Sequence, residues 1–290
     1  VIEADESDGS VVRYHPAVGV LLNLQKDHKE IPVVAELFRR FRAQIRETCV
    51  VGEAENLREF AGTAVVGFGP EATLRAEAVE LAPSGSAFQI EGVSFRLPVP
   101  GRHNVENALA ALAACRALGV PLTDMVDPLA RFQGVARRFQ VLGTQGGVTV
   151  VDDFGHNPAK VAASLRTAHL RAEAASGRVL AVFQPHGYGP LKFLRAEFVE
   201  AFAEGLCARD RLWFLEVFYA GGTVTRDISS ADVVADLTRR GVPAEVAPSR
   251  EALVARLAAE ARPGDLILVM GARDPSLTDF ARAILAALPA

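Results

Sequence analysis

The chain has 290 residues, with 31 basic and 35 acidic side chains and a formal net charge of -4. Half of its residues are hydrophobic and 23% are charged, a composition that excludes disordered and fibrous proteins. At roughly 100–200 residues per domain, the length predicts two domains. The mildly acidic balance gives no electrostatic reason to expect a nucleic-acid partner. No apolar run reaches ~18 residues, so the sequence predicts no membrane-spanning segment.

The three cysteines, Cys49, Cys115 and Cys207, are widely spaced and odd in number. They are expected as small core side chains of a cytoplasmic protein, without a disulfide or zinc framework. The sequence opens on Val1 and runs at once from apolar into acidic residues. We therefore expect a fragment that begins within a strand. No lysine follows a glycine, so there is no phosphate-binding loop of the G-x-x-x-x-G-K-S/T type.

In chain order, short apolar runs alternate with helical patterns, which predicts an α/β architecture with largely parallel strands. The first half is expected to contain strands over 17–24 and 48–51, a helix over 33–46, a small antiparallel meander over 64–99, and helices over 104–118 and 122–132.

After Gly134 the pattern changes to strands that are each followed by a helix, which predicts a doubly wound α/β domain. The expected strands cover 147–152, 179–184, 211–217, 244–247 and 265–270, and the expected helices cover 158–174, 191–206, 230–240, 250–261 and 277–288.

Gly67–Ala72 superficially matches a dinucleotide-binding fingerprint after an apolar strand. That motif needs a helix next, because the N–H groups at the helix start receive the pyrophosphate. Pro70 and the alternating residues after it predict a turn and another strand instead.

Two polar clusters follow apolar runs in the first half: Glu3–Asp8, with four carboxylates, and Asn23–His28. Each can be a solvated loop. Together, at neighbouring strand ends, they could instead hold Mg²⁺ or Mn²⁺ that bridges to phosphate. Further along, Asn104 opens the alanine-rich helix, where it can serve as the N-cap or read an adenine edge.

Three polar segments follow strands of the second half: Asp152–Pro158, Gln184–Gly189 and Gly271–Asp274. In a doubly wound sheet, ligands bind outside the carboxyl ends of the strands. These segments therefore predict one functional crevice.

Seven ordered segments resemble the Mur ligases, the ATP-dependent ligases that add amino acids in peptidoglycan synthesis. The segments are Glu3–Asp8, Asn23–His28, Gly101–Ala111, Phe132–Phe139, Asp152–Pro158, Phe183–Tyr188 and Gly264–Ala272. The resemblance implies an N-terminally truncated P-loop-type central ATPase domain over 1–136 and a Rossmann-like C-terminal domain over 137–290. It implies that a UDP-sugar domain and the phosphate loop belong to a longer protein, and that this chain alone is inactive.

The resemblance is greatest to the branch that joins L-alanine to UDP-N-acetylmuramate, or to a relative that attaches murein tripeptide. It implies a UDP-N-acetylmuramate-type acceptor, an amino acid, ATP and Mg²⁺ (or Mn²⁺), with an acyl-phosphate intermediate. The alternatives are a related ligase with another amino acid or acceptor, and a non-catalytic binding module.

By the same resemblance, Glu3 and His28 would hold the divalent cation. The remaining assignments are Asn104 and Asn107 at the nucleotide base, Arg138 and Asp153 at ATP, and His156 and His186 on the amino-acid and acyl-phosphate side.

The chain departs from the family pattern at two places. Asn157 stands where a second histidine is common, and Gly187–Leu191 replaces a segment with two arginines. Losing arginines removes rigid donors for carboxylate or phosphate. Phe218–Gly222 and Arg226-Asp227 are candidates for compensating contacts.

Overall fold

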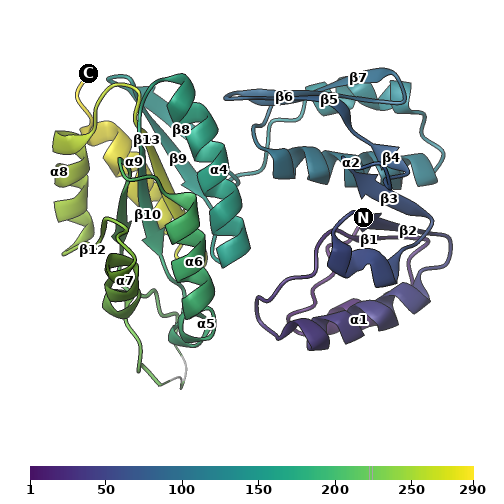
Figure 1. The fold of residues 1–290 in the computed structure, drawn as a ribbon, viewed down its shortest axis with the longest axis horizontal. Coiled ribbons are helices and arrows are strands. Elements are labelled where there is room, and N and C mark those ends of the chain that lie inside the picture. The colour runs from purple at the N-terminus through teal and green to yellow at the C-terminus, as the bar shows by residue number, and fades with distance from the viewer. Residues whose placement is uncertain (222, 224) are drawn as a thin grey trace. The chain divides into compact units, whose positions relative to one another are not determined.

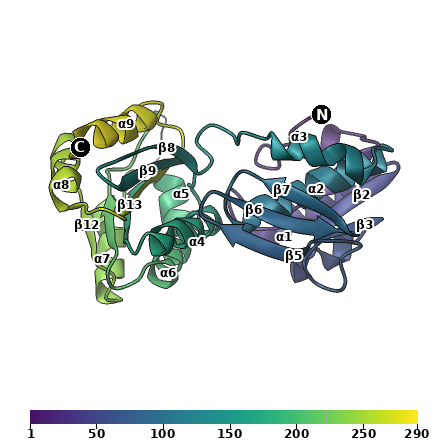
Figure 2. The same cartoon turned by 90° about the horizontal axis from the view of Figure 1, so that it is seen from above.

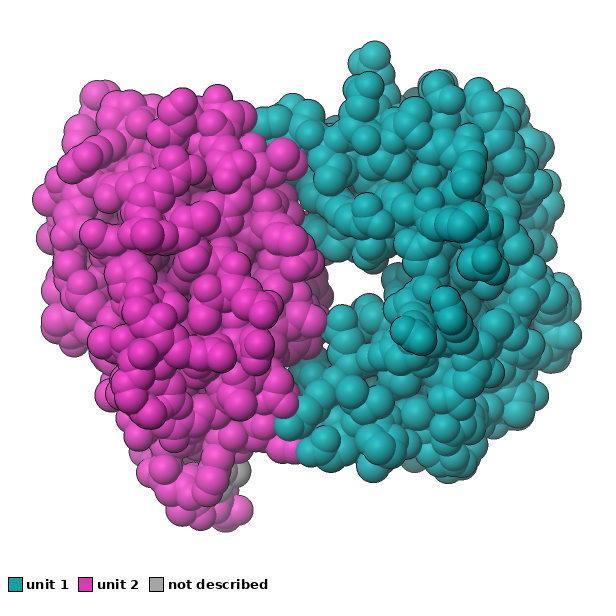
Figure 3. All heavy atoms as spheres, in the orientation of Figure 1, with its two compact units in different colours: residues 1–133 teal, residues 134–290 magenta. Residues whose placement is uncertain are grey.

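The computed structural model describes residues 1–221, 223 and 225–290. The chain divides into two compact units, Val1–Gln133 and Gly134–Ala290, which Figure 3 colours separately. Each unit has its own sheets and core, and each is described by itself.

Unit 1 contains a parallel sheet with strand order β1-β2-β3-β4. Its strands are β1 (Val18–Leu21), β2 (Thr48–Gly52), β3 (Ala64–Gly67) and β4 (Leu74–Arg75). The expected meander over 64–99 is therefore wrong in its first part, because β3 and β4 continue the parallel sheet. The apolar β3 extends that sheet by pairing with the buried β2.

The rest of the expected meander is confirmed as a separate antiparallel sheet, β5-β6-β7. Its strands are β5 (Glu77–Ala82), β6 (Gly85–Ile90) and β7 (Val93–Leu97). Phe88 and Phe95 are directly paired across β6 and β7, and their rings stack with centroids 5.5 Å apart. This aromatic pair anchors the meander to the core of unit 1.

The parallel sheet of unit 1 is covered on both faces. Successive residues of β2 point to opposite faces, so that Cys49 and Val51 pack with helix α1 (Ile31–Gln44). Val50 packs with helix α2 (Arg102–Ala117). Figure 1 shows α2 between the parallel sheet and the β5–β7 sheet.

The short helical segments of unit 1 are η1 (Ser10–Arg13), η2 (Glu55–Phe60), η3 (Leu122–Met125) and α3 (Val126–Ala130). The single helix expected over 122–132 is thus two short segments. Pro128 lies in the first turn of α3, the part of a helix where proline is tolerated. At the start of the chain Val1 and Ile2 are exposed and belong to no strand in the described structure, which corrects the expectation of a strand there.

Unit 2 has a six-stranded sheet with the order β12-β11-β10-β13-β9-β8. Its strands are β8 (Gln140–Gln145), β9 (Val148–Asp153), β10 (Val179–Gln184), β11 (Arg211–Phe214), β12 (Ala244–Val246) and β13 (Leu266–Gly271). The five predicted strands run parallel, and the unpredicted β8 pairs antiparallel with β9 at the edge. Gly146 and Gly147 join β8 to β9 with φ of 56° and 77°, which suits a tight hairpin turn.

Helices cover both faces of this sheet, so the predicted doubly wound fold is confirmed. They are α4 (Pro158–Ala174), α5 (Tyr188–Phe193), α6 (Arg195–Gly205), α7 (Ser230–Arg239), α8 (Arg250–Glu260) and α9 (Leu277–Ala287). Leu268 of β13 packs with α4–α7, and its neighbour Val269 packs with α8 and α9. Figure 2 shows α4 and α6 on one face and α9 on the other.

Local sequence explains where several of these helices begin. Asn157 caps α4 and Ser249 caps α8, each accepting a backbone N–H of the first turn, and Ser229 forms a capping box with Asp232 at α7. The helix expected over 191–206 is divided into α5 and α6, which meet at Leu194. Among the described residues, none of the helices combines the length and apolar character needed to cross a bilayer.

Candidate active site

Three adjacent strands of unit 2 end in polar residues. In the register of the sheet, Asp152 of β9 lies beside Val269 of β13, and Gly271 lies beside Gln184 of β10. The polar segments predicted from the sequence therefore follow neighbouring strands at one edge of the sheet. This edge, where ligands bind in doubly wound folds, is the candidate active site.

Asp153 is buried and accepts three hydrogen bonds of 2.7 Å from its own unit. Its Oδ1 accepts the N–H of Gly155 and the hydroxyl of Ser164, and its Oδ2 accepts the N–H of Phe139. The carboxylate thus holds the loop after β9 and the segment before β8. The contact with ATP expected for Asp153 stays a prediction.

Asp152 is fully buried beside the Arg137 guanidinium, with Arg137 Nε 3.5 Å from Asp152 Oδ2. The same oxygen accepts the Thr278 hydroxyl at 2.6 Å, and Arg137 donates to the carbonyl of Gly271 at 2.7 Å. Asp152 Oδ1 accepts no hydrogen bond from the described residues, which leaves a buried acceptor at the end of β9. Sequence reasoning had singled out Arg138 and not Arg137, which joins the ends of β9 and β13.

His156 and His186 are brought together as the sequence predicted, with ring centroids 5.0 Å apart and nearly perpendicular planes. His156 Nδ1 lies 2.9 Å from the carbonyl oxygen of Phe154, to which it donates. His156 Nε2 is the remaining acceptor of the neutral ring and lies 3.3 Å from the Lys160 ammonium. His186 is buried, and its strand bridge to Phe218 fixes the loop after β10.

Arg138 is exposed, and its guanidinium lies 5.0 Å from the centre of the Phe154 ring. Arg137 lies 4.9 Å from the same ring. A guanidinium over an aromatic face keeps its charge and loses mobility. The guanidinium groups of Arg137 and Arg138 thus lie against the Phe154 ring, which also contacts the ring of His156.

Asn157, where the resemblance implies a second histidine, has a clear local role. It is buried, and its Oδ1 accepts the N–H of Lys160 at 2.9 Å, which caps α4 ahead of Pro158. The capped helix positions Lys160 one turn away, where its ammonium reaches His156.

Arg250 links the ends of β10 and β13. It donates to Gln184 Oε1 at 3.2 Å, to Ser276 at 2.8 Å and to the carboxylate of Asp274. Burial raises the pKa of Asp274, but the hydrogen bonds from Ser276 and Arg250 outweigh it and hold that pKa below its ordinary value. Arg250 and Ser276 were not singled out from the sequence.

The segments proposed to compensate for the missing arginines form an aromatic cluster. The rings of Tyr188 and Tyr219 lie 5.5 Å apart, and the Arg226 guanidinium lies 4.7 Å from the Tyr219 ring and 5.7 Å from the Tyr188 ring. The buried Tyr219 hydroxyl makes no hydrogen bond to the described residues. Asp227 pairs with Lys192 instead. Gly222 lies outside the described residues.

The predicted cation ligands Glu3 and His28 lie in exposed loops of unit 1. Lys29 ties the two loops together, because its ammonium donates to the backbone carbonyls of Glu6 and Ser7. Asp27 Oδ1 lies 3.9 Å from His28 Nε2. Across the described ranges, the group of three potential metal ligands that the side chains do form lies elsewhere, in unit 2.

Asn104 and Asn107 lie three residues apart on α2 and share a helix face. Asn107 is exposed, and Asn104 donates to the carbonyl of Pro100 at 2.6 Å. The N-cap of α2 is Gly101, with φ of 100°, so the N-cap expectation for Asn104 is wrong. Glycine adopts this φ without the strain that a Cβ would add, so the N-cap lies three residues earlier than expected.

The turn prediction for Gly67–Ala72 is confirmed, since β4 follows β3 without a helix. The N–H groups of Phe68 and Gly69 donate to Glu53 Oε2 at 2.8 and 2.7 Å. The Glu53 carboxylate thus binds the N–H groups that would face a pyrophosphate in a dinucleotide-binding motif. The Arg102 guanidinium lies 3.6 Å from the centre of the Phe68 ring, a contact not foreseen from the sequence.

The three cysteines are free thiols, but only Cys49 is a core side chain. Cys115 and Cys207 are exposed, which corrects the expectation for these two residues. Cys115 lies in α2, and Cys207 in the loop between α6 and β11, where a polar turn brings it to the surface.

Comparison with known families gives two matches that together cover most of the chain. A family described as the Mur ligase middle domain matches residues 1–115. A family described as the Mur ligase, glutamate ligase domain matches residues 137–273.

Curated relatives and solved structures agree with these matches. The UDP-N-acetylmuramate–L-alanine ligase of Mycolicibacterium vanbaalenii is 37% identical over 317 residues, covering 100% of this chain and 64% of the relative. The crystal structure of UDP-N-acetylmuramate-alanine ligase MurC from Thermotoga maritima has a TM-score of 0.74 at 22% identity, covering 98% of this chain and 62% of that one. MurF from Acinetobacter baumannii has a TM-score of 0.77 at 19% identity, with 98% and 63% covered. The chain thus spans less than two thirds of these relatives.

Proposed function

The chain belongs to the Mur ligase family, and from this premise we propose that the protein carrying it is an ATP-dependent ligase. It joins an amino acid, L-alanine, to the carboxylate of a UDP-N-acetylmuramate-type acceptor in peptidoglycan synthesis. The names of the curated relatives support this choice of substrates. Residues 1–136 are proposed as the central ATPase domain and residues 137–290 as the C-terminal domain.

The observation that carries the proposal is the pairing of His156 with His186 at the ends of β9 and β10, next to the Arg138–Phe154 contact. Imidazoles and arginine at one strand edge suit a reaction that moves protons and phosphate together. Because the match to the ligase family over residues 137–273 includes this edge, we assign these side chains to acyl transfer.

The proposed reaction has two steps. The acceptor carboxylate attacks the γ-phosphate of ATP, which gives an acyl phosphate and ADP. The amine of the amino acid then attacks the acyl carbon, the amine loses a proton, and inorganic phosphate leaves. Because phosphoryl transfer depends on positioning and charge neutralisation, Arg138 is assigned to the phosphate groups.

His156 is assigned to the amine side. Its Nδ1 donates to the Phe154 carbonyl and its Nε2 faces the Lys160 ammonium, so Nε2 accepts a proton from the amine once Lys160 gives up this contact. The nearby Lys160 ammonium adds positive charge that favours the departing phosphate. His186, buried against His156, is assigned to orient that ring and the acyl phosphate.

The nucleotide and the cation are assigned to unit 1. Asn104 and Asn107 share one face of α2, and their amides offer the donor and acceptor pair that an adenine edge needs. Glu3 and His28 provide oxygen and imidazole ligands, a donor set that suits Mg²⁺ or Mn²⁺, and Lys29 keeps their loops adjacent. When bound, the cation would offset charge on the phosphates. In unit 2, Asp153 holds the loop that carries His156.

The test uses the full-length gene product. Phosphate release is expected only when ATP, Mg²⁺, UDP-N-acetylmuramate and an amino acid are all present, with L-alanine preferred in an amino-acid panel. His156→Gln and His186→Gln are each expected to lower kcat at least about 100-fold, the size of a general acid–base contribution. His15→Gln, at an exposed position of unit 1, is the matched control and keeps full activity. Phosphate release that does not depend on any muramyl acceptor would exclude the substrate assignment.

A second candidate is a related ligase with another amino acid or acceptor. The observation in its favour is the aromatic cluster of Tyr188, Tyr219 and Arg226, which stands near the segment that departs from the family. Full turnover with a substrate other than L-alanine in the same panel would select it.

A further inference from the structure

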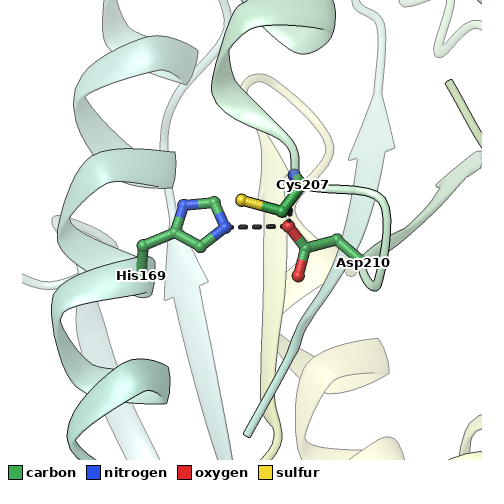
Figure 4. Close-up of side chains that lie close together, drawn as sticks. All are labelled: His169, Cys207 and Asp210. Atoms are coloured by element: carbon green, nitrogen blue, oxygen red, sulfur yellow. Dashed lines mark hydrogen bonds and ion pairs between the residues drawn. The ribbon is translucent and has the colours of Figure 1, made fainter.

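A second group of reactive side chains lies at the amino ends of the unit 2 strands, and Figure 4 shows its three members. His169 is on α4, and Cys207 and Asp210 are in the loop between α6 and β11. Their ligand atoms all lie within 4.8 Å of one another. Asp210 directly precedes β11 and binds the N–H of Val179, the first residue of β10. The group is therefore at the amino ends of the strands, whereas the histidine pair follows their carboxyl ends.

We propose that His169, Cys207 and Asp210 form a binding site for a divalent cation of the zinc class, with a fourth position open to water. A thiolate, an imidazole and a carboxylate are the three ligand types that proteins use for zinc. Mg²⁺ and Ca²⁺ prefer oxygen ligands, so the thiol selects against them.

The geometry needs only a small adjustment to accept the ion. His169 Nε2 and Asp210 Oδ2 are 2.8 Å apart in their hydrogen bond. Two ligands of a tetrahedral zinc ion, each about 2.1 Å from the metal, are roughly 3.4 Å apart. Figure 4 shows the Cys207 sulfur pointing toward the imidazole, so opening the hydrogen bond makes room for an ion among the three atoms.

The backbone already holds the carboxylate in place. Asp210 is buried, its Oδ1 accepts the N–H of Val179 at 2.9 Å, and its Oδ2 accepts the N–H of Cys207 at 2.7 Å. The N–H of Asp210 in turn donates to the carbonyl of Cys207 at 3.0 Å. Such outer hydrogen bonds orient a metal ligand before the ion arrives. Cys207 is exposed, which gives the ion a path from solvent.

Binding exchanges protons for the cation. Without an ion, the Asp210 carboxylate is hydrogen-bonded to the His169 imidazole. The ion displaces the proton of the Cys207 thiol and, where the imidazole is charged, one proton of His169, so affinity rises with pH. The bound ion joins α4 to the starts of β10 and β11, and we assign it a stabilising role separate from the proposed ligase reaction.

The test is titration of the purified protein with Co²⁺ in excess Mg²⁺, which fills oxygen-only sites. We expect one Co²⁺ per chain with thiolate-to-cobalt charge-transfer absorption that Zn²⁺ abolishes by competition. Cys207→Ser removes that absorption. His169→Gln weakens Zn²⁺ binding at least about 100-fold, because even the outer partners of a metal ligand change affinity 10–100-fold. Zn²⁺ is also expected to raise the Tm of the unaltered protein and not that of Cys207→Ser.

Cys115→Ser is the matched control, because Cys115 is also exposed but belongs to α2 of unit 1 and is not one of the three ligands. It keeps the absorption and the affinity. Circular dichroism confirms that each variant is folded. Absence of the thiolate absorption in the unaltered protein, or its persistence in Cys207→Ser, overturns the proposal.

Discussion

The carboxylate of Asp153 accepts the backbone N–H of Phe139 at 2.7 Å, across 14 positions of sequence. Phe139 and Arg137 both have left-handed backbones, with φ of 48° and 58°. Such conformations cost about 1–3 kcal/mol each for residues other than glycine. The hydrogen bond to Asp153 therefore helps to hold a strained segment that carries Arg137 and Arg138 to the candidate site.

Asp153→Asn is expected to lower the free energy of unfolding by about 2–4 kcal/mol, because an amide N–H replaces an acceptor that faces three donors. Urea unfolding followed by circular dichroism measures the change. Ser164→Ala, which removes one of the three donors, is the control and costs about 1 kcal/mol. Equal stability of Asp153→Asn and the unaltered protein would contradict this structural role of the carboxylate.

Asn157→Ala is expected to lower the free energy of unfolding by about 1 kcal/mol, because α4 loses its N-cap. Asn157→Asp is the control, since a carboxylate can accept the same N–H and suits a helix N-terminus. Asn157→His introduces the residue that the resemblance implies at this position and is expected to destabilise as alanine does. Thermal unfolding of the three variants decides, and a histidine variant as stable as the unaltered protein contradicts the capping role.

The elements that the sequence predicts best are those whose signals are local. Helix 158–174 and strand 179–184 have the predicted bounds, because a capping asparagine with proline starts the helix and an unbroken apolar run forms the strand. β8 was missed because it is a half-exposed edge strand with glycine in it. Its existence depends on pairing with β9, which is tertiary information.

The candidate sites show the same difference between local signals, which the sequence reveals, and tertiary contacts, which it does not. The strand-end rule places Asp152, Gln184 and Gly271 along one edge, and the structure confirms it. Sequence reasoning could not find the cluster of His169 and Asp210, because packing of α4 against α6 brings together residues 41 positions apart. The Cys-x-x-Asp spacing before β11 was the one local signal for it.

Gly177→Ala is expected to cost about 3 kcal/mol or more, because the added Cβ would lie 1.9 Å from the carbonyl oxygen of Gly264. The three nearest atoms all belong to the backbone of Gly264 and Asp265, so the clash can be relieved only if the loops before β10 and β13 move. Gly189→Ala is the matched control, with nothing within 4 Å of its Cβ and a position in α5. It is expected to change stability by less than about 1 kcal/mol, in the stabilising direction. Urea unfolding compares the two, and similar values would contradict the steric account.

The His169–Asp210 pair is expected to make stability depend on pH in a defined window. The hydrogen bond to Asp210, aided by the charge of Glu173, raises the pKa of His169 above its ordinary value of 6.5 despite burial. The contribution of His169 to the free energy of unfolding is therefore complete below pH 6.5 and is lost as pH rises through the pKa of His169 in the folded protein. Burial raises the pKa of Asp210, but the hydrogen bonds from His169 and two backbone N–H groups lower it below 3.8 overall. The contribution of Asp210 is present above pH 3.8 and is lost as pH falls through the lowered pKa.

With a chelator present, His169→Gln should thus lower the free energy of unfolding by about 1.5–3 kcal/mol between pH 3.8 and pH 6.5, the worth of a hydrogen bond between charged groups. The cost should shrink on either side. Urea unfolding of both proteins across this range measures it, and a cost that grows above neutral pH would contradict the charged pair.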